Sequence, residues 1–530
     1  MNTETRPDIL LIVLDTLRAD RLSCYGYPRE TSPHIDAFAG GGVLFERAIS
    51  PAQWTVPAHA SLFTGEYPTT HMTVQIYDEH RKDQSTLAEV LRHAGYHTVG
   101  FCNNPLLGVV ENGLDRGFEE FYNYGGVLPE RPPVVDSRPR LVGRVAQRVG
   151  RLLRRLTSPV QRALTRNNML LRVALHPWIV PLWQPHINFK GNTVQSMRDV
   201  LGYLGARRRK EARRPLFAFI NLMETHLPYQ PRPRFMRRFA PYYRKDREAQ
   251  DFMQGYNLEH YKWMVPLTEP LTELQDRVLN DMYDAEVAYE DHLLWRLFAH
   301  LDEPEVRDNT LVILTSDHGE GLNHHDFVGH SLVAYDDLVR VPLAVRYPRL
   351  YPEGRRVARP VSARRVFHSA LEAVGISSAS NGAGEVTGAP VDVAGLSLAR
   401  ALDDADAEGG VVFSEAYTPD TLITLMENDD PESIDRFRCR FMRRAAYQGN
   451  HKLITVDDEP DELFDVVNDP GELNNLIGEQ PEVVAALNDR LATFRAETEA
   501  RRPANWEGSR LSLEGDEEVL ERLRGLGYIE

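Results

Sequence analysis

The chain has 530 residues, of which 42% are hydrophobic, and a formal net charge of −16. This length exceeds what one hydrophobic core usually serves, so two domains are expected, and the composition excludes a disordered chain. The acidic balance argues against nucleic acid as a partner. The three cysteines are too widely spaced for a disulfide framework or a zinc motif.

The first eight residues, MNTETRPD, contain no basic n-region, apolar h-region or cleavage site. No uncharged apolar run of 18 residues occurs anywhere, so the sequence predicts neither a signal peptide nor a membrane-spanning helix. We therefore expect a cytoplasmic location. The sequence leaves the oligomeric state open.

The first predicted element is a strand over residues 9–14, and Asp15 follows it directly. A helix over 84–94 and a strand over 97–102 come next, so residues 1–125 have βαβ patterning. A short β-branched run closed by a carboxylate is typical of a buried parallel strand that delivers its last side chain to the edge of the sheet.

Residues 131–214 differ from the rest because basic residues outnumber acidic ones there. Within them, residues 141–165 place apolar side chains at near-helical spacing with arginines between. One interpretation is a lid or an interfacial helix that contacts an anionic membrane or polymer. The other, favoured by the break at Pro159, is an insertion that packs its apolar stripe on the core.

Two further buried strands are predicted over 217–222 and 311–316, with a helix over 281–301 before the second. Asp317 and His318 follow that second strand, 302 residues after Asp15. In open α/β sheets, ligands bind outside the carboxyl ends of the strands. Asp15, Asp317 and His318 are therefore expected to surround one divalent cation; the alternative is two helix N-caps.

Around residues 376–410 the chain is rich in Ser, Ala, Gly, Asn and Asp, which predicts a linker or a long surface loop. Short strands over 445–447 and 452–456 and a helix over 480–499 follow. We therefore expect a catalytic α/β domain over 1–395, with the basic insertion at 131–214. A smaller α+β domain is expected over 411–530, with a short antiparallel sheet and terminal helices.

Several long motifs occur in order: DILLIVLDTLRADRLSCYGY from residue 8, WTVPAHASLFTG at 54–65, NLMETHLPY at 221–229, TSDHGEGLNHHDFVGH at 315–330 and RVPLAVRYP at 340–348. They resemble the sulfatase family of the alkaline phosphatase superfamily. The stretch ELFDVVNDPGELNNL at 462–476 resembles that family's C-terminal subdomain. The resemblance implies a large, mostly parallel mixed sheet between helices and a smaller C-terminal α+β subdomain.

The sequence departs from that family at the residues that would do the chemistry. The motif C/S-x-P-x-R, whose first residue is converted to formylglycine, is matched by Thr55-Val-Pro-Ala-His59. Threonine cannot give formylglycine, because its Cβ already bears a methyl group. The family's paired aspartates are matched by Asp15 and Thr16, and its two lysines by Asn103 and His330.

Thr55 is therefore the expected nucleophile, because an alkoxide bound to a divalent metal attacks phosphorus effectively. The resemblance implies a metal-dependent hydrolase or transferase that acts on an anionic ester, a phosphate mono- or diester or a related ester. One alternative is a sulfuric ester hydrolase without formylglycine. A second is a non-catalytic member of the family.

Further expectations concern the metal and the histidines. Asp15, Asp317, His318 and Thr55 would hold one divalent metal, with Ca²⁺, Mn²⁺, Zn²⁺ and Mg²⁺ all compatible with these ligands. A second metal at His324, His325 and His330 is possible but less favoured. By resemblance, His59, His226 and His330 are expected to be catalytic, and Asn103 and His325 to bind substrate.

Overall fold

The structure is a computed structural model, and it describes residues 6–125, 132, 190–209, 213–259, 263–264, 266–267, 269–376, 393–403, 406–502, 510–511 and 520. The predicted helix over 141–165 lies outside these residues, so its two interpretations stay predictions. The same holds for most of the predicted linker between 376 and 410.

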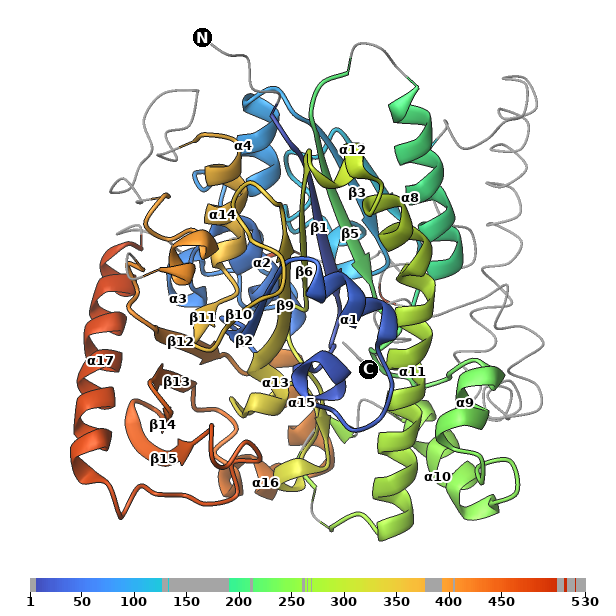
Figure 1. The fold of residues 1–530 in the computed structure, drawn as a ribbon. Helices are drawn as coiled ribbons and strands as arrows, with labels where there is room; N and C mark the ends of the chain where they lie inside the picture. Colours follow the sequence, from blue (N-terminus) through green and yellow to red (C-terminus); the bar gives the residue numbers. More distant parts are fainter. Residues whose placement is uncertain are drawn as a thin grey trace.

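A nine-stranded sheet forms the centre of the molecule (Figure 1). Its strands run in the order β10-β2-β9-β6-β1-β5-β3-β4, and β11 also pairs with β2. The strands are β1 (Asp8–Leu14), β2 (Val43–Ile49), β3 (His97–Cys102), β4 (Glu120–Asn123), β5 (Leu216–Leu222), β6 (Thr310–Thr315), β9 (Arg340–Arg346), β10 (Arg355–Val357) and β11 (Val361–Ser362).

Strand β1 lies in the middle of this sheet and pairs in parallel with β5 on one side and β6 on the other. Strand β9 is antiparallel to both β6 and β2, which makes the sheet mixed. Since β1, β3, β5 and β6 all run the same way, their carboxyl ends meet at one edge.

Alternate residues of β1 enter two separate hydrophobic cores, as the two-residue repeat of a strand requires. Ile9, Leu11 and Val13 belong to the core that also includes residues of α2 (Thr55–Thr64), α4 (Leu87–His93) and α14 (Arg365–Ala373). Leu10, Ile12 and Leu14 belong to the core shared with α1 (Pro33–Gly40), α8 (Thr193–Arg208) and α11 (Glu273–Leu301). Helices therefore cover both faces of the sheet (Figure 1).

A second, four-stranded antiparallel sheet lies in the C-terminal part, in the order β12-β13-β14-β15. Its strands are Val411–Ala416, Arg443–Gln448, His451–Val456 and Glu459–Asp465. Helix α17 (Pro481–Ala500) packs Leu487 and Leu491 against it. The smaller elements are α3 (Pro68–His71), α9 (Pro233–Phe239), α10 (Arg247–Leu258), α12 (Pro304–Arg307), α13 (Asp336–Val339), α15 (Asp420–Asp429), α16 (Pro431–Arg436) and the hairpin β7–β8 (Gly321–Leu322, Val328–Gly329).

The expected fold class is confirmed: a mostly parallel mixed sheet between helices, with a C-terminal antiparallel subdomain. The expected limits of the two domains stay predictions. No helix within the described ranges is both long enough and apolar enough to span a bilayer.

Candidate metal centre and active site

Two carboxylates from neighbouring strands meet at the carboxyl edge of the large sheet. Asp15 follows β1, and Asp317 lies two residues beyond the end of β6. The register of the parallel pair joins Val13 to Thr315, which brings the two aspartates level with one another. With His318 they form a group whose candidate ligand atoms all lie within 4.8 Å of one another. The structure therefore brings together the three residues predicted from the strand ends, and we call these three candidate ligands the metal group.

The oxygens of this group fit a cation. Asp15 Oδ1 and Asp317 Oδ2 are buried, and neither has a hydrogen-bond donor among the described residues. Burial raises the pKa of the Asp15 carboxyl to about 6. Burial and the neighbouring charge of Asp15 raise the pKa of the Asp317 carboxyl well above its usual range. Two buried carboxylates facing each other are costly unless a positive charge lies between them.

The imidazole of His318 is oriented for coordination. Its Nδ1 lies 2.8 Å from the carbonyl oxygen of Gly319, a geometry in which Nδ1–H donates to that carbonyl. The lone pair is then on Nε2, which lies 3.4 Å from Asp317 Oδ2. Burial also lowers the pKa of His318 well below its usual value, which keeps the ring neutral. A neutral imidazole held by a backbone carbonyl is a common ligand geometry for metals.

Thr55 lies beside this group, at the first position of helix α2. Its Oγ1 is 3.3 Å from His318 Nε2, and the residue is fully buried. The helix begins here after Trp54, whose backbone is extended and whose side chain makes no capping hydrogen bond. The amino end of a helix carries a partial positive charge, which favours an anion or a developing negative charge at this position.

His59 lies one turn further along α2 and is turned back toward Thr55. Its Nδ1 is 3.0 Å from the Thr55 carbonyl oxygen and 3.3 Å from Asp317 Oδ2. Its ring packs edge-on against Phe63 and Phe219. Burial lowers its pKa to about 4, so the ring is neutral near pH 7. Its catalytic role stays a prediction.

His226 and His330 lie next to the candidate metal ligand His318. The His330 ring centroid is 4.7 Å from that of His318 and 5.0 Å from that of His226. His226 comes from the turn after β5, and its Nδ1 is 2.6 Å from the Leu227 carbonyl oxygen. Both are buried, and the three rings form one cluster.

The sequence did not indicate that Glu320 is a partner of His330 or that Tyr229 is a partner of Glu320. Glu320 Oε1 lies 2.9 Å from His330 Nδ1, and its Oε2 accepts the Tyr229 hydroxyl at 3.0 Å. His330 Nε2 is buried and has no partner among the described residues. The Glu320 carboxylate thus orients the ring through Nδ1. The one signal in the sequence that could have indicated this role of Glu320 is its position three residues after Asp317.

Two of the predicted substrate contacts have other partners here. The Asn103 side-chain amide donates to Thr193 Oγ1 at 2.7 Å, while its Oδ1 is buried and lacks a donor in the described structure. Asn104, which the sequence reading passed over, donates to Asp15 Oδ2 at 2.7 Å. The His325 ring stacks on Tyr335, with centroids 3.8 Å apart. The substrate-binding roles of Asn103 and His325 stay predictions.

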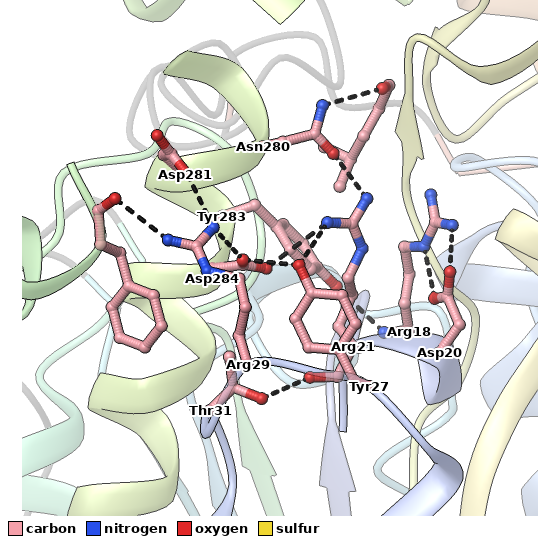
Figure 2. A network of polar contacts seen from close by, with 12 residues as sticks. Arg18, Asp20, Arg21, Tyr27, Arg29, Thr31, Asn280, Asp281, Tyr283 and Asp284 are labelled. Atoms are coloured by element: carbon pink, nitrogen blue, oxygen red, sulfur yellow. Dashed lines mark hydrogen bonds and ion pairs between the residues drawn. The ribbon is translucent and has the colours of Figure 1, made fainter. Parts of the chain in front are cut away.

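Helix α11 holds the loop that follows β1 through a network of polar contacts (Figure 2). The Tyr283 hydroxyl donates to the Thr16 carbonyl at 2.7 Å and accepts the Arg18 amide N–H at 3.0 Å. Arg21 and Arg29 both reach Asp284 on the same helix. Because Thr16 has a left-handed φ of 62°, this loop depends on such partners to keep its shape.

Arg18 also joins the two loops that carry the aspartates. Its guanidinium is buried, donating from Nη1 to the Glu320 carbonyl at 3.0 Å and from Nη2 to Asp337 at 2.6 Å. The three candidate ligands therefore lie on two loops that the Arg18 side chain joins.

Comparison with known proteins identifies the family of the chain. The family model described as Sulfatase matches residues 7–376. The chain belongs to the sulfatase family. An uncharacterized sulfatase of Escherichia coli (strain K12) is 25% identical over 89% of this chain and 83% of its own length. The ulvan-active sulfatase of Formosa agariphila is 23% identical over 94% of this chain and 83% of its own length.

Solved structures of the sulfatase fold match the whole architecture. The phosphonate monoester hydrolase of Agrobacterium radiobacter superposes with a TM-score of 0.65, at 23% identity, over 93% of this chain and 96% of that one. The corresponding enzyme of Silicibacter pomeroyi gives 0.61, at 20% identity, over 93% and 96%. The expectation of a sulfatase-family ester hydrolase is therefore confirmed at the level of the family.

Proposed function

We propose that this sulfatase-family protein is a metal-dependent hydrolase or transferase of phosphate esters, with Thr55 as its nucleophile. The observation that carries the proposal is the Thr55 hydroxyl, at the amino end of α2 and 3.3 Å from His318 Nε2 in the metal group. It stands where the sulfatase motif has its modifiable residue, and its methyl group rules out formylglycine.

Asp15, Asp317 and His318 would hold the divalent cation, together with the Thr55 oxygen. Such a cation would lower the pKa of a bound hydroxyl and polarise an ester oxygen. Ca²⁺, Mn²⁺, Zn²⁺ and Mg²⁺ all accept two carboxylates and an oxygen, and the imidazole favours Mn²⁺ or Zn²⁺ over Ca²⁺.

The chain's own groups would then carry out two displacements. Thr55 Oγ1 gives its proton to solvent and attacks phosphorus, forming a Thr55–phosphoryl bond while the bond to the leaving alcohol breaks. Protonated His330 or His226 gives the departing oxygen a proton. Water, or a second alcohol, next gives a proton back to that histidine and attacks the phosphoryl group, and the departing Thr55 oxygen regains a proton from solvent. Water as acceptor gives hydrolysis, and an alcohol gives transfer.

A phosphate ester is favoured over a sulfate ester because Thr55 cannot form a formylglycine hydrate. A formylglycine hydrate can expel sulfate by collapsing to the aldehyde, whereas a threonine adduct must be broken by attack at phosphorus or sulfur. The similarity to phosphonate monoester hydrolases supports phosphorus chemistry. The sulfatase relatives support sulfuric esters as the second candidate.

A substrate panel tests the proposal. Aryl phosphate, phosphodiester, phosphonate and sulfate esters are offered to the metal-stripped protein with Mg²⁺, Ca²⁺, Mn²⁺ or Zn²⁺ added back. We expect phosphorus esters to be turned over faster than sulfate esters, and Thr55→Ala to reduce kcat by at least about 10³-fold. Thr55→Ser is the matched control, since it keeps the hydroxyl.

Two results would refute the proposal in different ways. Faster turnover of sulfate than of phosphorus esters would support the sulfuric ester alternative. No turnover of any ester with any metal, in a protein that binds the metal, would support a non-catalytic member of the family.

A further inference from the structure

A cavity of about 690 Å³ opens at the amino ends of β1, β5 and β6, at the end of the sheet opposite the metal group. Its wall comes from the segments that enter these strands and from the last turns of α8 and α11, in the upper part of Figure 1. We call it the amino-end cavity; its lining includes Arg6, Asp8, Leu204, Arg207, Arg213 and Leu301. A volume of this size suits a small organic molecule.

Five arginines line the amino-end cavity, against two carboxylates, Asp8 and Glu305. The arginines come from three segments: one before β1, one at the end of α8 and one before β5. This concentration of positive charge stands out in a chain whose net charge is −16. Clefts lined by one sign of charge attract ligands of the other sign.

Two of the arginines are already matched by carboxylates. Arg208 pairs with Glu303 and Glu305, and Arg214 pairs with Glu119 at 2.6 Å. For the other three, Arg6, Arg207 and Arg213, the lining offers one further carboxylate, that of Asp8. Arg6 also donates to the carbonyl oxygen of Ala94, and Arg207 to that of Arg214.

Asp8 is shared rather than dedicated to one of them. Its Oδ1 lies 3.3 Å from Arg207 Nη2 and also accepts the amide N–H of Leu216 at 2.7 Å. Its Oδ2 lies 3.7 Å from Arg213 Nη2, a longer contact. One carboxylate thus serves two guanidiniums and an amide, so among the described residues the cavity carries more positive than negative charge.

Arg207 gives the sharpest sign of a missing partner. Only 9% of its side chain is exposed, and its Nε has no hydrogen-bond partner among the described residues. Burial, opposed by Asp8, and the adjacent charge of Arg213 lower its pKa. A buried donor of this kind costs free energy unless an acceptor reaches it.

The ends of the helices do not explain the whole cluster. Arg207 and Arg208 lie in the last turn of α8, where they offset the negative end of its dipole. Arg6, Arg213 and Arg214 lie outside helices, so no dipole calls for them.

Six of the other lining residues are apolar, Leu10, Ala94, Leu204, Pro215, Leu301 and Val306, and three are polar, His300, Asn309 and Thr310. We infer that the amino-end cavity binds a phosphate monoester whose organic part is small and apolar. A phosphate dianion offers several oxygens to several guanidiniums at once, and the apolar wall takes the rest of the molecule. This site is separate from the metal group, and the inference does not depend on the proposed function.

Binding of hexyl phosphate, measured by calorimetry on the full chain in a phosphate-free buffer, tests the inference. The double variant Arg6→Gln/Arg213→Gln removes two exposed guanidiniums from the cavity. We expect its Kd to rise at least about tenfold, or about 1.4 kcal/mol. The control, Arg244→Gln/Arg355→Gln, makes the same charge change at two exposed positions away from the cavity and should bind as the unmodified protein does.

A further variant separates this cavity from the metal group. Asp317→Asn removes a metal ligand, and hexyl phosphate should still bind to it with unchanged affinity. All measurements use the Thr55→Ala background, so that the probe is not consumed. Vesicles with phosphatidic acid form a second arm. If the vesicles compete with hexyl phosphate, the phosphate group that binds the cavity belongs to a lipid headgroup. If they do not compete, the ligand is a free phosphate ester.

Three results would overturn the inference. The first is no binding of hexyl phosphate up to about 1 mM, a ΔG° weaker than about −4 kcal/mol. The second is equal affinity in Arg6→Gln/Arg213→Gln and its control. The third is loss of binding in Asp317→Asn while the arginine double variant still binds, which would place the probe at the metal group.

Discussion

At the scale of single residues, Thr55 is where this chain departs furthest from the sulfatase motif it otherwise follows. The neighbouring His59 departs as well, since it stands at the motif's arginine position and turns its Nδ1 toward the Thr55 carbonyl. The two changes together replace a modifiable residue and a fixed positive charge by a hydroxyl and a neutral ring.

A substitution at this position separates the two changes. Thr55→Cys restores a modifiable residue, but His59 still occupies the arginine position that the C/S-x-P-x-R motif requires. We expect little sulfate ester hydrolysis to appear, even when the variant is produced alongside a formylglycine-generating enzyme. Mass spectrometry of the peptide that contains residue 55 should give the encoded mass for both proteins. Detection of formylglycine in Thr55→Cys would contradict this.

The contact between Glu320 and His330 leads to a second prediction. Glu320→Ala removes the acceptor of His330 Nδ1, so the ring loses the partner that directs Nε2 toward a substrate. We expect kcat to fall by about 10–100-fold, with KM nearly unchanged. Glu462→Ala, which also removes a carboxylate bonded to a tyrosine hydroxyl but in the C-terminal subdomain, is the control. An equal fall of kcat in both variants would mean that the effect comes from lost stability and not from the contact with His330.

At the scale of elements, helix α11 supports the metal group without supplying a ligand. The Tyr283 hydroxyl donates to the carbonyl of Thr16 and accepts the amide N–H of Arg18, so the backbone that follows Asp15 is held by the helix. The sheet fixes where β1 ends, and the helix fixes how the chain continues from there.

Tyr283→Phe tests this support, because it removes one hydroxyl and leaves the packing of the ring. We expect the unfolding free energy to fall by about 1–3 kcal/mol, the cost of leaving buried backbone groups without partners. Metal affinity should fall by about 10–100-fold, as for other residues that position ligands. Calorimetric titration of the metal-free protein with Mn²⁺ measures the second effect.

Tyr27→Phe is the matched control for that experiment. It removes a hydroxyl from the same network, one that donates to Asp284 at 2.7 Å, but it does not touch residues 16 and 18. It should lower stability while leaving metal affinity unchanged. If both variants lose metal affinity equally, the network acts as a whole and not through Tyr283.

At the scale of the whole molecule, several buried histidines make stability depend on pH. Burial, aided by the charge of Arg116, lowers the pKa of His80 to about 3. Burial also lowers the pKa values of His71 and His368 well below their usual range. Between the folded and unfolded pKa values, only the unfolded chain binds these protons, so stability is present above about pH 6.5 and is lost as the pH falls.

We therefore expect the unfolding free energy to decrease as the pH is lowered from 6.5 toward 4, by up to about 1.4 kcal/mol per pH unit for each such histidine. His80→Asn, which keeps a polar atom near Thr73 Oγ1, should have a slope smaller by about 1 kcal/mol per pH unit. Denaturant titrations at pH 7, 6 and 5 give the slopes. An unchanged slope would mean that His80 is protonated in the folded protein.

The sequence alone predicted the parts of the molecule that follow from local pattern. Apolar runs gave β1, β3, β5 and β6 almost to the residue, and the carboxylates at two strand ends gave the metal group. The antiparallel strand β9 between β2 and β6 was not predicted, because strand order depends on contacts between distant segments.

The same limit applies to the partners of the site residues. Asn104, not Asn103, reaches Asp15, and a one-residue difference after a strand depends on how the chain turns there. Glu320 and Tyr229 come from different loops and meet only in the folded protein. The amino-end cavity gave no signal in any single motif, because its arginines come from three segments.

The central place of β1 has a consequence for how the protein is made. Its two neighbours, β5 and β6, end at Leu222 and Thr315, so the second neighbour of residues 8–14 leaves the ribosome only after about 300 further residues. At 5–20 residues per second, that takes roughly 15–60 seconds of synthesis. Throughout this time one of the most apolar stretches of the chain has at least one open edge. We therefore expect nascent chains shorter than about 315 residues to be bound by chaperones or to aggregate. The residues of the metal group can come together only after β6 has been synthesised.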